Sequence, residues 1–136
     1  MAVVVAVDFG EKRIGVATSD ASGLLATPRV TLARTSDAAA IEALARFCRE
    51  EESELVVFGI PRSPEGVESP FAARIRSFAA RFELETGLPV RFHEETLTSD
   101  EASRRLPRHA RREDVDRTAA AVLLEDYLQH AGPRPR

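Results

Sequence analysis

The sequence is poor in the residues that build disulfide scaffolds and membrane spans. It has one cysteine and no tryptophan among 136 residues, so a fold held together by intramolecular disulfides is excluded. No apolar run approaches the roughly 20 residues that a spanning helix needs. The amino terminus has neither a basic flank nor a small-residue cleavage site, which argues against a signal peptide. We therefore expect a cytoplasmic protein without membrane contact, in which Cys48 is an inert thiol of the core.

The composition is that of a globular protein, with 43% apolar and 30% charged residues. The length predicts one domain, which we assign to residues 1–131, followed by a flexible tail at 132–136. The net charge is only −3 and gives no overall signature for nucleic acid. All basic residues except Lys12 are arginine, however, and five of them crowd together: Arg104, Arg105, Arg108, Arg111 and Arg112. The planar arginine side chain suits phosphate, but a solvated helix end is an equally good interpretation of this cluster.

The order of apolar patterns predicts a mixed α/β fold. Three strands joined by short links indicate an antiparallel meander, and the later alternation of helix and strand indicates parallel crossovers. A proline at position 28 suits an edge strand. The order matches the ribonuclease H-like fold, a five-stranded mixed sheet with helices on both faces. The strands are expected at 2–8, 13–18, 25–32, 55–59 and 89–93, and the helices at 37–52, 70–86, from 98 onward, and at 114–130.

Carboxylates stand at several predicted strand and helix ends. Asp8 ends an otherwise apolar strand, where an unpaired charge would be costly to bury, although an aspartate that begins a turn is common. Glu94 and Glu95 follow the last strand, where either a crevice site or a solvated loop is expected. Asp114 is explained by helix capping. Asp116 is explained less well, because it lies further inside the helix.

Together these acids fit a site for a hard divalent cation. Magnesium prefers oxygen ligands, and two such ions about 4 Å apart can activate water and stabilise the leaving oxygen of a phosphodiester. The spacing typical of zinc sites, a serine nucleophile elbow and a P-loop are all missing from the sequence. We expect ordinary packing or surface roles for His93 and His109.

Four segments, in order, resemble the motifs of the YqgF/RuvX family. Residues 8–17 (DFGEKRIGVA) resemble its first motif, and residues 57–61 (VFGIP), followed by Gly66, resemble its second. Residues 93–99 (HEETLTS) and 115–124 (VDRTAAAVLL) resemble the third and fourth. The resemblance covers nearly the whole chain. It departs from the family pattern at Glu94, at Thr96, which stands where arginine is usual, and in the short link 107–113.

The resemblance implies a ribonuclease H-like, metal-dependent endonuclease. Its metal-binding acids would be Asp8, Glu95 and Asp116, with Mg²⁺ or Mn²⁺ as cofactor and two ions expected. Family members are described as nucleases that mature the end of the 16S rRNA precursor or as Holliday junction resolvases. The implied partner is therefore rRNA precursor or branched DNA, and resolution of a symmetric junction would favour a homodimer.

The basic residues acquire expected roles under this interpretation. Lys12 and Arg13, in the turn after Asp8, would hold a phosphate near the metals, and Arg62 would line the groove. The five clustered arginines would contact the sugar-phosphate backbone without reading sequence. Two alternatives remain: a non-catalytic rRNA-binding factor of ribosome biogenesis, and a nucleotide-dependent phosphotransferase, which would need a second lobe.

Overall fold

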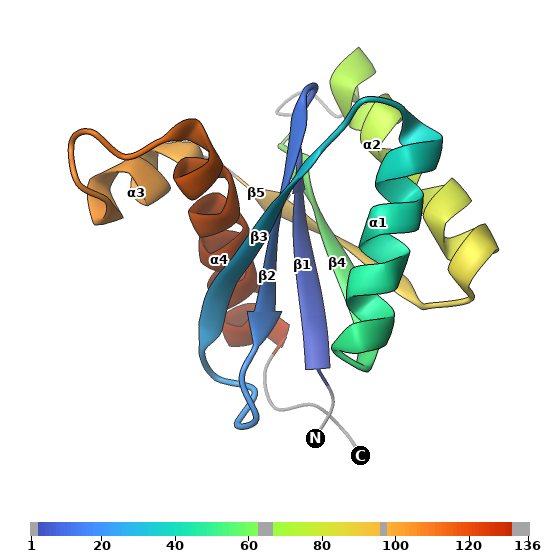
Figure 1. The fold of residues 1–136 in the computed structure, drawn as a ribbon, viewed down its shortest axis with the longest axis horizontal. Coiled ribbons are helices and arrows are strands. Elements are labelled where there is room, and N and C mark those ends of the chain that lie inside the picture. Colours follow the sequence, from blue (N-terminus) through green and yellow to red (C-terminus); the bar gives the residue numbers. More distant parts are fainter. Residues whose placement is uncertain (1–2, 63–66, 96–97, 132–136) are drawn as a thin grey trace.

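A computed structural model describes residues 3–62, 67–95 and 98–131. Five strands and four helices follow one another in the predicted order (Figure 1). The strands are β1 (Val3–Phe9), β2 (Arg13–Ser19), β3 (Ala26–Ala33), β4 (Ser53–Pro61) and β5 (Val90–Glu95). The helices are α1 (Asp37–Glu50), α2 (Pro70–Thr86), α3 (Thr98–Arg105) and α4 (Arg112–Ala131).

The strands form one mixed sheet in the order β3-β2-β1-β4-β5. Strands β1, β2 and β3 pair antiparallel as the predicted meander, and β1, β4 and β5 run parallel. Pro28 lies in β3, an edge strand, as its missing amide proton requires. The predicted ribonuclease H-like arrangement, with helices on both faces, is confirmed.

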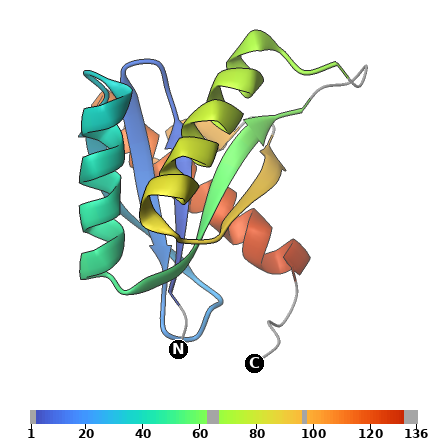
Figure 2. The same ribbon diagram turned by 90° about the vertical axis from the view of Figure 1, so that its right-hand side faces the viewer.

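Each face of the sheet carries its own apolar core. On one face, Val5, Val7 and Phe58 pack against α1 and α2, which lie next to each other in Figure 2. On the other face, Val4 and Ala6 pack against α4. Adjacent residues of a strand point to opposite faces, so β1 contributes alternately to both cores. Its continuous run of small and β-branched apolar residues follows from this two-sided burial.

Local signals set most of the helix ends. The hydroxyls of Ser36 and Ser69 accept hydrogen bonds from backbone amides in the first turns of α1 and α2. Gly87 ends α2 in the left-handed conformation, with φ of 77°. Cys48 lies on the buried face of α1, within the core, and burial raises the pKa of its thiol to about 12. The predicted place of Cys48 in the core is therefore confirmed.

Some bounds differ from those predicted. Strand β4 runs from Ser53 to Pro61, because its pairing with β1 and β5 continues beyond the apolar run at 55–59. Helix α4 begins at Arg112, two residues earlier than expected. The tail predicted at 132–136 lies outside the described residues. Among the helices that the structure describes, none combines the length and apolar character needed to cross a membrane.

Candidate active site

Asp8 is half-buried in β1 and lies on the sheet face that α4 covers. Val4 and Ala6 belong to the core beneath that helix, and alternation along the strand places Asp8 on the same face. The register agrees, because Asp8 pairs with Gly15 of the neighbouring strand, and directly opposed residues of an antiparallel pair share a face. A carboxylate at the end of an apolar strand is thereby directed towards the first turns of α4.

Gly15 brings the backbone of α4 directly onto the sheet. A Cβ atom at this position would lie 1.9 Å from the carbonyl oxygen of Asp116 and 2.9 Å from the amide nitrogen of Arg117. Only glycine permits such an approach. Since Gly15 is also the cross-strand partner of Asp8, the structure places Asp8 and Asp116 at the same level of the same face. A glycine inside a buried strand is the sequence signal for this contact.

The carboxylate of Asp116 is partly exposed and forms an ion pair with Arg13. The Nε atom of Arg13 donates to Oδ2 of Asp116 at 2.6 Å, and the two side chains are 29% and 24% exposed. Arg13 was predicted to hold a phosphate, whereas here it contacts one of the predicted metal-binding acids. A positive group therefore already lies at the oxygen that a cation would use.

Asp114 has a structural role, as its position predicted. It occupies the first turn of α4 and accepts a hydrogen bond from the backbone amide of Arg111 at 3.3 Å. It also forms an ion pair with Arg117. Both carboxylate oxygens of Asp114 therefore have partners within the start of the helix. Asp116 differs, because its partner Arg13 belongs to the sheet.

Glu95 is the last residue of β5 and pairs with Pro61 of β4. Strands β1, β4 and β5 are parallel neighbours, so their carboxyl ends lie at one edge of the sheet, the usual place for a site in an open α/β fold. The edge that ends with Glu95 is therefore also the edge at which Asp8 lies. Glu94, which precedes it, is exposed, and its Oε1 atom lies 3.7 Å from Nε of Arg62. Thr96 and Gly66 lie outside the described residues.

The predicted arginine cluster divides into two groups. Arg104 pairs with Glu101, and Arg105 pairs with both Glu101 and Glu125. The Glu125 carboxylate is the main cause of a raised pKa for Arg105. The second group lies around the link between α3 and α4. Its members are exposed, and no carboxylate of the described residues pairs with their side chains: Arg108, Arg111 and Arg112.

Lys12 is exposed in the turn between β1 and β2, beside Arg13. The turn is fixed from outside the hairpin, because the carbonyl oxygen of Lys12 accepts a hydrogen bond from the amide of Arg34 at 2.9 Å. The exposed side chain of Lys12 thus extends from a backbone that Arg34, directly after β3, holds in place.

Two relatives with the same name match nearly the whole chain. A protein of Moorella thermoacetica named "Putative pre-16S rRNA nuclease" is 38% identical over 134 residues, which are 95% of this chain and 96% of the relative. A protein of Rippkaea orientalis with the same name is 36% identical over 126 residues, which are 89% and 91% of the two chains.

The fold comparison agrees with the topology. The structure of T. thermophilus RuvC in complex with a Holliday junction substrate covers 100% of both chains with a TM-score of 0.63, at 13% sequence identity. At that identity the likeness concerns the fold. The family model described as RuvX, Holliday junction resolvase, matches residues 2–130. The resemblance of the four sequence motifs is thereby confirmed, and the chain belongs to the RuvX (YqgF) Holliday junction resolvase family.

Proposed function

We propose that this protein is a metal-dependent endonuclease that cleaves phosphodiester bonds in structured nucleic acid, with the 16S rRNA precursor as its substrate. The observation that carries the proposal is the contact over Gly15, which joins Asp8 and Asp116 at one level of one sheet face. Relatives named for pre-16S rRNA cleavage, at 36–38% identity, favour the RNA substrate. Membership of a family described as Holliday junction resolvase makes branched DNA the second candidate.

The residues at this edge fit a hard divalent cation. Asp8, Glu95 and Asp116 offer only oxygen donors, which Mg²⁺ and Mn²⁺ prefer. The ion pair between Arg13 and Asp116 shows that a positive group is accommodated at the Asp116 carboxylate. When bound, two such ions would activate a water molecule and stabilise the departing oxygen. In this proposal the three acids hold the ions from β1, β5 and α4.

The protein's own residues would orient the acids and the substrate. Arg13 holds the Asp116 carboxylate from the sheet side, and it is free to turn to a phosphate once a cation occupies that oxygen. Lys12, one residue earlier, extends from the same turn. The exposed residues Arg108, Arg111 and Arg112 lie around the start of the helix that carries Asp116, so their contacts with the sugar-phosphate backbone would place a nucleic-acid strand across the acids.

The test compares Asp8→Asn with the native protein on a labelled 16S rRNA precursor and a four-way junction, each with Mg²⁺ and with Mn²⁺. We expect Asp8→Asn to abolish cleavage while its circular dichroism and its affinity for nucleic acid are kept. Asp20→Asn is the matched control, since Asp20 lies in the β2–β3 turn, where it accepts hydrogen bonds from Ser22 and backbone amides. It should cleave like the native protein.

The remaining outcomes contradict parts of the proposal. Cleavage retained by Asp8→Asn refutes the acid assignment. Cleavage of the junction alone refutes the RNA substrate, and paired cuts there would call for a homodimer, which sedimentation measures directly. Steeply salt-dependent binding of the precursor without turnover, in either metal, would instead identify a non-catalytic rRNA-binding factor.

A further inference from the structure

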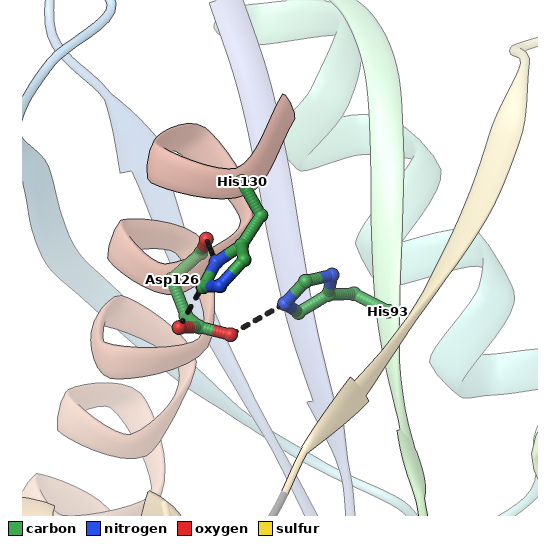
Figure 3. A group of neighbouring side chains, drawn as sticks. All are labelled: His93, Asp126 and His130. Carbon is green, nitrogen blue, oxygen red and sulfur yellow. Dashed lines mark hydrogen bonds and ion pairs between the residues drawn. The ribbon is translucent and has the colours of Figure 1, made fainter. Parts of the chain in front are cut away.

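Two histidines and an aspartate meet at the far end of α4 from Asp116. His93 of β5 faces the last turns of the helix, where Asp126 and His130 lie one turn apart (Figure 3). Nε2 of His93 lies 2.6 Å from Oδ2 of Asp126, and Nδ1 of His130 lies 3.3 Å from Oδ1. One ligand atom from each side chain lies within 4.8 Å of the other two. Among the side chains that the structure describes, this is the one such group of three His, Cys, Asp or Glu residues.

We propose that His93, Asp126 and His130 form a binding site for a transition-metal dication of the zinc class. Two imidazoles and one carboxylate are the donor set that zinc takes in sites with three protein ligands and an open fourth position. Imidazole suits zinc, copper, iron and nickel, whereas magnesium, calcium and manganese prefer oxygen. The donor chemistry therefore differs from that of the three acids in the proposed nuclease site.

Hydrogen bonds around the cluster already orient the ligands. Nδ1 of His130 lies 2.8 Å from the backbone carbonyl oxygen of Asp126. A carbonyl oxygen only accepts, so Nδ1 carries the proton and the lone pair of a neutral ring lies on Nε2. A histidine held by its other nitrogen in this way is the usual arrangement at a metal. The ring of His93 packs edge-on against Tyr127, with centroids 5.7 Å apart, which restricts its rotation.

The arrangement needs little movement to close around an ion. Ligand atoms about 2.1 Å from a tetrahedral zinc lie about 3.4 Å from one another. Separations of up to 4.8 Å therefore require a contraction of about 1.4 Å at most. The 2.6 Å between Nε2 of His93 and Oδ2 of Asp126 requires an opening of about 0.8 Å. The side chain of His130 is 68% exposed and that of Asp126 is 47% exposed, so both can adjust and a metal can enter from solvent. His93, only 19% exposed, supplies the fixed ligand.

The centre of the cluster lies away from Asp116, although His93 precedes Glu95 by two residues of β5. Asp126 follows Asp116 by ten residues of the same helix, which is about 15 Å along its axis. A bound ion would join β5, the strand that ends with Glu95, to the last turns of α4. We therefore expect it to act as a clamp between two elements of the sheet-helix interface, whether or not the protein is a nuclease.

The experiment titrates the chelator-treated full chain with Zn²⁺ alone, by calorimetry, in a buffer that contains millimolar Mg²⁺. We expect one Zn²⁺ per chain and an increase in the melting temperature. His130→Gln and Asp126→Asn should each weaken binding by at least about tenfold, the lower end of the effect known for supporting residues of metal sites. His130 is exposed and Asp126 is about half-exposed, so circular dichroism should show that the variants are folded.

His109→Gln is the matched control, because His109 is exposed in the α3–α4 link and outside the cluster. It should bind Zn²⁺ like the native chain. Absence of saturable binding, or an equal loss in His109→Gln, overturns the proposal. So does loss of Zn²⁺ binding in Asp8→Asn with retention in His130→Gln, which would locate the ion among the acids. Co²⁺ in place of Zn²⁺ gives an independent check, since ligand-field bands should appear in the native chain and vanish in His130→Gln.

Discussion

Substitution of Gly15 by alanine should damage both the fold and the site, because the new methyl group meets the backbone of α4. Its Cβ would lie 1.9 Å from the carbonyl oxygen of Asp116. An ordinary carbon–oxygen contact is about 3.4 Å, so strand and helix must separate by about 1.5 Å. Overpacking of this kind costs about 1–3 kcal/mol, which should lower the melting temperature by roughly 4–12 °C for a chain of this size.

The same displacement moves Asp116 relative to Asp8. A misplacement of about 1 Å in a catalytic constellation can cost about a hundredfold in rate, so we expect Gly15→Ala to lose cleavage by about that factor while it remains folded. Gly23→Ala is the matched control: its φ is 75° and a Cβ there meets nothing within 4 Å. It should lose about 1–2 kcal/mol through backbone strain and keep its cleavage rate. Native stability and native cleavage in Gly15→Ala would refute the close approach of α4.

Three further predictions concern surface charge and the buried thiol. Arg112→Gln should weaken nucleic-acid binding and reduce the slope of log affinity against log salt concentration by about one, as measured by binding isotherms. Arg105→Gln is the control, because Arg105 pairs with carboxylates of the protein, and it should leave that slope unchanged. Cys48, with a pKa of about 12, should resist iodoacetamide at pH 8 until the chain is unfolded, and rapid native labelling would contradict its burial. Glu51→Gln should cost up to about 1 kcal/mol in unfolding free energy at pH 7. The hydrogen bond from Arg29 lowers the pKa of Glu51 below the ordinary 4.5. The stability that native Glu51 contributes is therefore full above pH 4.5 and is lost as the pH falls through the lower pKa of the folded state. If urea titrations gave the same difference in unfolding free energy between native protein and Glu51→Gln at acid pH as at pH 7, the result would argue against this pair.

Features set by local chemistry were predictable from sequence. Ser69 followed by proline marked the start of α2, and Gly87 marked its end, because a cap and a left-handed residue are decided within a few positions. Pro28 indicated an edge strand for the same reason, since its missing amide proton cannot join an inner ladder. The alternation of strands and helices was then enough to identify the fold.

Features that depend on how α4 crosses the sheet were not predictable. The pairing of Arg13 with Asp116 joins residues that are 103 positions apart in sequence, and no local pattern encodes the angle of that helix. The meeting of His93 with Asp126 has the same origin. The role of each histidine is ambiguous from sequence alone, and the cluster forms only because the last turns of α4 lie against β5. The convergence of the three acids stays a prediction from the family resemblance and the sheet edge.

The contact over Gly15 also bears on when during folding the acid edge is completed. Asp8 belongs to the first strand and Asp116 to the last helix, so the two come together only after a long loop has closed, a step whose entropic cost slows formation of distant contacts. A nascent chain on the ribosome exposes β1 through β5 before Arg112–Ala131 has emerged. Until that helix docks, the proposed site lacks Asp116, one of its three acids, so we expect no cleavage of ribosomal RNA by the unfinished chain.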